Sequence, residues 1–281
     1  MKLIECPRDA MQGIHDFIPT QVKAEYINKL LKVGFDTIDF GSFVSPKAIP
    51  QLQDTVQVLE KLDLDSSNSK LLAIVANIRG AKDACQYPQI DYLGFPFSVS
   101  ETFQKRNTNS TISESLQTID ELVNLCSKHD KIAVVYLSMG FGNPYGDEWS
   151  NEIVEQLASD LVNRGVRILS LADTIGVSTP EKINYLVTHL VKRFPGTELG
   201  VHLHSTPDSR EEKIDAAYIS GCRRFDSALK GLGGCPMATD SLTGNIATEN
   251  MISYLEQKGE KLNLDMQAWQ EAMEYSNRVF K

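Results

Sequence analysis

The sequence has few cysteines, and none of them belongs to a CxxC motif. Five are spread along the 281 residues, at Cys6, Cys85, Cys126, Cys222 and Cys235. An odd number of widely spaced cysteines argues against a disulfide framework and favours a reducing compartment. The N-terminal residues MKLIECPRDA go directly into a polar motif, without the apolar core of a signal peptide. We therefore expect a cytoplasmic location.

Long apolar runs and an excess of positive charge are also missing. No stretch approaches the roughly 18 apolar residues of a membrane span, so no membrane partner is expected. The formal net charge of -9 argues against nucleic acid as a partner, because such proteins need a basic surface. GxGxxG and Walker-type loops are absent, which weakens a nucleotide-binding open sheet.

Short runs rich in β-branched residues alternate with longer segments of helical period. This alternation is typical of βα units around a parallel sheet. Right-handed crossovers repeated eight times close into a (β/α)8 or TIM barrel, an α/β fold that commonly reaches ~250 residues as one domain. An open doubly wound sheet of six or seven strands is the alternative. The expected strands are Lys2–Cys6, Thr37–Gly41, Lys70–Ala76, Tyr92–Phe97, Lys131–Ser138, Arg167–Asp173, Glu198–His204 and Arg223–Leu229.

Helical periodicity fills several of the segments between these strands and continues after the last one. Apolar stripes predict helices over Pro19–Lys32, Ile112–His129 and Asn151–Arg164. Two further helices, Met251–Lys258 and Met266–Phe280, are expected at the C-terminal end. We expect one barrel domain over residues 1–281, on which the C-terminal helices within 251–281 pack.

His202 and His204 lie one residue apart at the end of an apolar run, ELGVHLH. In an extended strand, residues i and i+2 face the same side, so both imidazoles can bind one ion or one substrate. A pair of hydrogen-bonded core histidines is the alternative for this motif alone. The functional face of such a barrel lies where its strands end, which makes the other residues at strand ends informative.

Polar residues are concentrated at these predicted strand ends. Taken singly, they have plain structural explanations, such as a surface ion pair, a helix cap or a small buried hydrophobe. Taken together with the histidine pair, the carboxylates form a mixed nitrogen and oxygen donor set, for which Mg²⁺, Mn²⁺, Fe²⁺ and Zn²⁺ all remain open. The residues are Arg8 and Asp9 after the first strand, Asp39 and Ser42 with the second, Asp173 at the sixth, and the glycine-rich segment 231–236 after the eighth.

Five motifs resemble, in order and spacing, the 3-hydroxy-3-methylglutaryl-CoA (HMG-CoA) lyase family of the DRE-TIM metallolyase superfamily. The likeness extends from Ile4 to about Leu255. It implies a (β/α)8 barrel that cleaves HMG-CoA to acetyl-CoA and acetoacetate, with an acyl-CoA substrate and a homodimer. It leaves open whether the reaction serves leucine degradation or ketone-body formation. The motifs are ECPRDAMQ, DFGSFVSPKAIPQ, LADTIGVSTP, VHLH and GLGGCPMA followed by TGNIATEN.

The resemblance also implies roles for the matching residues. Arg8 matches the residue that faces the thioester oxygen, where negative charge develops. Cys235 matches a catalytic cysteine that takes part in proton transfer, in a loop to which Gly233 and Gly234 give backbone freedom. The implied cofactor is Mg²⁺ or Mn²⁺. Its implied ligands are Asp9, His202, His204 and Asn245; Asp39 and Asp173 complete the polar groups that face the substrate, and Gln12 and Ser42 are further substrate-binding or loop residues.

Some positions depart from the family pattern. Asp39 stands where Glu is more common, and Ser205 follows His204 where an Asp is usual, so that a carboxylate which would orient a ligand histidine is missing there. These departures keep two alternatives open: a related aldol or Claisen enzyme acting on another acyl-CoA or 2-oxo acid, and a metal- or acyl-CoA-binding protein without catalysis. Lys47 and Arg106 are candidate CoA contacts or simply surface charges.

Overall fold

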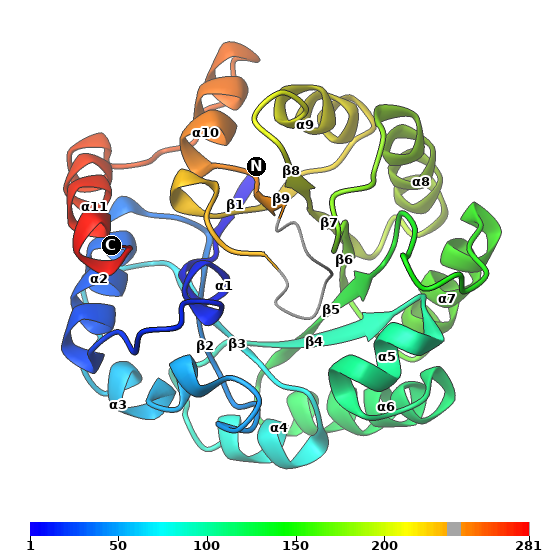
Figure 1. Cartoon of the computed structure of the whole chain (residues 1–281), viewed down its shortest axis with the longest axis horizontal. Helices are drawn as coiled ribbons and strands as arrows, with labels where there is room; N and C mark the ends of the chain where they lie inside the picture. Colours follow the sequence, from blue (N-terminus) through cyan, green and yellow to red (C-terminus); the bar gives the residue numbers. More distant parts are fainter. Residues whose placement is uncertain (235–242, 281) are drawn as a thin grey trace.

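The computed structural model describes residues 1–234 and 243–280. Within these residues, eight parallel strands form a closed barrel in the order β1, β2, β3, β4, β5, β6, β7 and β9, and β9 pairs with β1 to close it (Figure 1). The (β/α)8 barrel expected from the sequence is confirmed. The strands are β1 (Lys2–Glu5), β2 (Thr37–Ser42), β3 (Lys70–Ile74), β4 (Tyr92–Ser98), β5 (Ile132–Ser138), β6 (Ile168–Ala172), β7 (Glu198–His202) and β9 (Arg224–Ser227).

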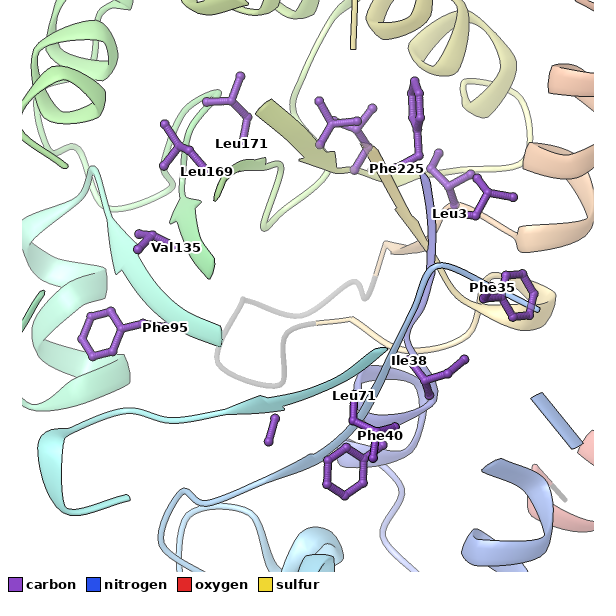
Figure 2. Close-up of a cluster of buried hydrophobic side chains, with 14 of the residues drawn as sticks. Leu3, Phe35, Ile38, Phe40, Leu71, Phe95, Val135, Leu169, Leu171 and Phe225 are labelled. Carbon is purple, nitrogen blue, oxygen red and sulfur yellow. The ribbon is translucent and has the colours of Figure 1, made fainter. Parts of the chain in front are cut away.

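Alternation along each strand divides the apolar residues between two cores. On β3, Leu71 and Ala73 belong to the large core between barrel and helices, whereas Leu72 and Ile74 belong to a smaller core inside the barrel. Successive side chains of a strand point to opposite faces, so one strand serves both cores. Figure 2 shows side chains of the outer core, among them Phe95 and Leu171, directed away from the barrel axis toward the helices.

Helices surround the barrel, and local signals fix several of their ends. Thr111 and Glu114 form a capping box at the start of α6, and Ser150 caps α7 through its side chain. The helices around the barrel are α1 (Pro7–Gln12), α2 (Thr20–Val33), α3 (Thr55–Leu59), α4 (Ile78–Ala84), α5 (Glu101–Thr108), α6 (Ile112–Lys128), α7 (Asn151–Asn163), α8 (Pro180–Arg193) and α9 (Arg210–Ile219), with short 3-10 turns η1 (Pro50–Leu52) and η2 (Leu229–Gly231).

Two C-terminal helices, α10 (Thr248–Gln257) and α11 (Met266–Val279), follow the barrel. Figure 1 shows α11 beside α2, and Trp269 of α11 packs edge-on against Phe35, with 6.0 Å between ring centroids. Tyr275 of α11 donates a hydrogen bond to Glu25 of α2. Among the described residues, no helix combines the length and apolarity that crossing a membrane would need.

One expected strand is shorter than the sequence suggested. The seventh strand was expected to continue to His204, but β7 ends at His202 and Leu203 lies outside any strand. His204 and Ser205 form a separate short strand, β8, which pairs antiparallel with β10 (Gly244–Asn245). The chain therefore leaves the barrel wall between the two histidines and crosses toward the segment that follows the eighth barrel strand.

Candidate active site at the carboxyl ends of the strands

Three side chains able to bind a metal meet where the barrel strands end. Asp9 lies in α1, directly after β1, while His202 ends β7 and His204 begins β8. One donor atom from each of the three lies within 4.8 Å of the other two. The Nε2 atoms of the two imidazoles are 3.3 Å apart. The pairing of β8 with β10 places Asn245 opposite His204, and its Nδ2 donates to Asp9 Oδ2 over 2.6 Å.

The two histidines differ in their surroundings. Nδ1 of His202 lies 3.2 Å from Oδ2 of Asp226, whose side chain is fully buried. Burial is the largest single influence and lowers the pKa of His202, but the hydrogen bond and charge of Asp226 and the charge of Asp9 together outweigh it, so the pKa is above the ordinary value. Burial and the neighbouring His202 lower the pKa of His204 to about 4, so this imidazole is neutral near pH 7 and can bind a cation.

Arg8 connects the acidic residues of the site. Its Nε and Nη2 donate to Asp39, and its Nη1 donates to Asp9 over 3.1 Å and to Gln12 over 2.8 Å. Burial raises the pKa of Asp39 to about 6, against the lowering effect of Arg8. For Asp9, burial raises the pKa, but the charges of Arg8 and the histidines lower it below the ordinary value. Arg8 is thus fixed on both sides, and Asp9 is kept ionised.

A cavity of about 220 Å³ lies beside these groups. Its apolar wall includes Ile74, Pro96 and Tyr136, and Arg106 of α5 also lines it. The volume suits a small acyl group, since pockets for drug-sized ligands span ~300–1,000 Å³. The predicted site residues that line the cavity are Arg8, Asp9, Gln12, His202 and His204.

Comparison with known proteins decides the family. The HMGL-like family model matches residues 3–275. The chain belongs to the HMGL-like family. A hydroxymethylglutaryl-CoA lyase of Bacillus subtilis is 35% identical over 93% of this chain and 86% of its own length. A cytoplasmic 3-hydroxy-3-methylglutaryl-CoA lyase of Rattus norvegicus is 31% identical over 98% of this chain and 80% of its own length.

Solved structures of lyases are similar to this HMGL-like chain along its whole length. A crystal structure of an HMG-CoA lyase from Bacillus subtilis superposes with a TM-score of 0.92 at 32% identity, covering 100% of this chain and 94% of that one. An HMG-CoA lyase from Acinetobacter baumannii, solved in complex with coenzyme A and 3-methylmalate, gives a TM-score of 0.90 at 30% identity, covering 99% and 90% of the two chains.

Some residues that the resemblance to HMG-CoA lyases predicted for the site do not line the cavity. Ser42 Oγ accepts a hydrogen bond from Val44 N, so it shapes the loop after β2. Asp173 accepts from Ser178 Oγ over 2.5 Å and from Lys213 over 2.9 Å, and its side chain is fully buried. The roles of Ser42 and Asp173 toward a substrate therefore stay predictions. Their hydrogen bonds stabilise the loops that surround them.

Gly233, in the described part of the glycine-rich segment, approaches the site closely. Gly233 has φ +93°, and a Cβ there would lie 2.8 Å from both Asn245 Nδ2 and the carbonyl oxygen of Asp9. Only glycine accommodates this contact and this conformation without strain. Gly234 follows it, also with positive φ. Cys235 lies outside the described residues, so its predicted role stays a prediction.

The donor set fits the divalent cation that the HMGL-like family implies. Two imidazole nitrogens facing each other at 3.3 Å, with the Asp9 carboxylate beside them, can bind one cation between them. A ligand histidine commonly has its other nitrogen bonded to a carboxylate, as His202 has with Asp226. Cys6, His202 and Asp226 form a second grouping, but two of its members, His202 and Asp226, are already hydrogen-bonded to each other.

Sequence reasoning missed two charged residues here, Asp226 and Lys213. Asp226 could have been found, because Arg224 and Asp226 alternate around the apolar Phe225 in a predicted strand, which turns both toward the barrel interior. Lys213 carried no such signal, because its acceptors at Asp173 and Gly176 are 40 and 37 residues away and the one at His204 is a backbone carbonyl.

Proposed function

We propose that this chain is a divalent-metal-dependent carbon–carbon lyase that cleaves 3-hydroxy-3-methylglutaryl-CoA to acetyl-CoA and acetoacetate. The observation that carries the proposal is the convergence of Asp9, His202 and His204 next to Arg8, at the edge of a cavity suited to an acyl group. Membership of the HMGL-like family and the names of its similar proteins support the same reaction.

The proposed cleavage breaks the bond between C2 and C3 of the acyl group. The tertiary hydroxyl loses its proton and becomes the ketone of acetoacetate, while the electron pair of the broken bond passes to the thioester as an enolate. The enolate carbon then takes up a proton, which gives acetyl-CoA. When bound, a divalent cation polarises the hydroxyl and carboxylate oxygens of the substrate and orients them.

The residues of the chain have distinct tasks in this scheme. Arg8, held by Asp39, stabilises the charge that develops on the thioester oxygen, and needs no rearrangement to do so. Asp9, His202 and His204, with Asn245 beside Asp9, would hold Mg²⁺ or Mn²⁺. Cys235 exchanges a proton with the hydroxyl or with the departing enolate. Arg106 at the cavity edge is the better placed of the two basic candidates for CoA, because Lys47 does not line the cavity.

The direct test uses purified, metal-stripped protein and HMG-CoA, with and without Mg²⁺ or Mn²⁺. We expect acetoacetate and acetyl-CoA to be released in equal amounts and only when metal is present. Absence of product with every metal, while circular dichroism shows folded protein, would contradict the proposal and favour another acyl-CoA substrate or a protein that binds without catalysis.

Our proposal also covers the domain organisation, the cellular location and the oligomeric state of the chain. We propose one domain over residues 1–281, supported by the packing of α11 on α2. A cytoplasmic location is supported by the free state of Cys6, Cys85, Cys126 and Cys222. A homodimer follows from the family resemblance, and sedimentation analysis of the purified chain tests it.

A further inference from the structure

Lys213 of α9 is a lysine placed almost entirely inside the protein. It is 3% exposed, and its ammonium group donates three hydrogen bonds. The acceptors are Asp173 Oδ2 at 2.9 Å, the carbonyl oxygen of His204 at 2.8 Å and the carbonyl oxygen of Gly176 at 3.1 Å. All three donors of the ammonium group are therefore used.

The Lys213–Asp173 pair contacts the backbone of both histidines. The carbonyl oxygen of His202 accepts a hydrogen bond from the backbone N–H of Asp173 over 2.9 Å. The carbonyl oxygen of His204 accepts one from Lys213, which is paired with the Asp173 side chain. One buried ion pair thus spans the point where the chain leaves β7 and starts β8.

The need for such support is greatest at His204. The ring of His202 is oriented by Asp226 through Nδ1, but Nδ1 of His204 has no side-chain partner among the described residues. His204 also lies in a strand of two residues, next to Leu203, where the barrel wall is interrupted. Apart from the contact with His202 Nε2 and a hydrogen bond with the backbone of Thr174, the direction of the His204 ring therefore depends on how firmly its own backbone is held.

We infer that Lys213 is a positioning residue of the metal site: it fixes the backbone at His204 against Asp173, so that the imidazole faces Asp9 and His202. This inference rests on the proposed function, because it assumes that these three residues bind the cation. Burying a lysine is costly unless it is fully paired, and three well-placed acceptors meet that condition here. Lys213 does not itself line the cavity, and it contacts His204 through the backbone carbonyl and not through the imidazole.

The test compares Mn²⁺ binding by the wild-type chain and Lys213→Met. Methionine keeps much of the length and apolar stem but removes the charge and all three hydrogen bonds. Free Mn²⁺ is measured by electron paramagnetic resonance during a titration, with no substrate present. We expect the Mn²⁺ affinity to fall by about 10- to 100-fold, the usual effect of losing a group that supports a metal ligand.

Lys131→Met is the matched control. Lys131 is 5% exposed and donates to the carbonyl oxygens of Tyr87 and Ile90, just before β5 begins and so at the opposite end of the barrel. Like Lys213→Met, the Lys131→Met variant loses buried hydrogen bonds to backbone carbonyls, so its stability should fall while its Mn²⁺ affinity stays unchanged. If Lys213→Met does not fold, Lys213→Gln replaces it in the same comparison, with the same expected direction.

The possible results of this experiment distinguish a failure of the inference about Lys213 from a failure of the proposed function. A folded Lys213 variant that binds Mn²⁺ as tightly as the wild type would overturn the inference and leave the proposed function intact. A wild-type chain that binds no Mn²⁺ would remove the proposed metal site and the inference with it. An equal loss of affinity in the Lys131 variant would show a general effect of lost stability, which also overturns the inference.

Discussion

The two ends of the barrel interior are both charged, but they use their charges differently. At the amino ends of the strands, Lys2 and Arg224 pair with Glu198 at 2.7 and 3.1 Å. At the carboxyl ends, Arg8 pairs with Asp39, while Asp9 and the two histidines turn donor atoms toward one another. The amino end is an ion-pair network, whereas the carboxyl end combines ion pairs of Arg8 with three donor atoms that lie close together.

The comparison shows what distinguishes a metal-binding site from a network of ion pairs. Opposite charges that pair with each other leave fewer free lone pairs for a metal ion, and such pairs add little stability where they are partly exposed, as Lys2 and Glu198 are. The two facing imidazole nitrogens share one proton at most, because a neutral imidazole donates at one nitrogen and accepts at the other. A metal cation can take the place of that shared proton and bind the lone pairs of both nitrogens.

The largest expected effect comes from removing one of the converging donors. His204→Ala removes one of the two imidazole ligands and leaves Asp9, His202 and Asn245, too weak a set for tight binding, so Mn²⁺ binding and HMG-CoA cleavage should both be lost. Mn²⁺ titration and acetoacetate release measure the two effects. Retention of either one in the folded variant would contradict the metal-binding role of His204.

Cys235→Ala should separate chemistry from metal binding. The resemblance gives Cys235 a role in proton transfer, so cleavage should fall by ~10²–10⁴-fold while Mn²⁺ affinity stays at the wild-type level. Single-turnover assays with saturating metal measure the chemical step. Near-normal turnover would remove the cysteine from the mechanism.

Glu5, at the end of β1, is a buried acidic residue that has no cation partner among the described ion pairs. It accepts from Leu229 N and Thr248 Oγ1, and burial raises its pKa from 4.5 to about 8. The unfolded chain releases this proton near pH 4.5, whereas the folded chain keeps it until about pH 8. The stability contributed by Glu5 is therefore fully present below pH 4.5 and lost as the pH rises through 8.

Glu5→Gln should remove this pH dependence, because the amide resembles the protonated carboxyl. The free energy of unfolding in urea, measured at pH 5 and pH 8, should fall for the wild type by an amount on the order of a few kcal/mol. The variant should show a much smaller difference. Parallel pH profiles for the two proteins would contradict the raised pKa of Glu5.

The smallest effect is expected at the amino end, from Lys2→Met. This change breaks the Lys2–Glu198 pair, while Arg224 keeps its bond to Glu198. We expect a loss of about 1 kcal/mol or less in unfolding free energy and no change in Mn²⁺ affinity. Weaker Mn²⁺ binding by this variant would contradict the view that the amino end does not contribute to the metal site.

Much of the fold could be predicted because each strand carries its own apolar run. All eight barrel strands occur within two residues of their predicted ends, including the run that leads to His202. The break at Leu203 could not be foreseen, because it depends on β8 pairing with β10, about 40 residues later in the sequence, and not on the local pattern.

The convergence of Asp9 with the two histidines could be predicted for the same reason. Asp9 and the histidine pair stand directly at strand ends, where the barrel brings side chains together. Lys213 sits on the buried face of α9 beside Ile214 and Ala217, but helical periodicity shows only that it faces inward. Which acceptors it meets depends on the tertiary arrangement of Asp173 and His204, which the sequence pattern does not contain.

The closure of the barrel by β9 against β1 also has a consequence for how the protein is made. Asp9 belongs to the first βα unit and the histidines to the seventh, so a chain emerging from the ribosome holds the two halves of the metal site apart. They meet only when β9 has been synthesised and has paired with β1, and such long-range pairing is the slow part of folding. A cation that binds only the closed barrel would then favour its completion. Capture of the metal by a nascent chain would therefore report that the ring has closed.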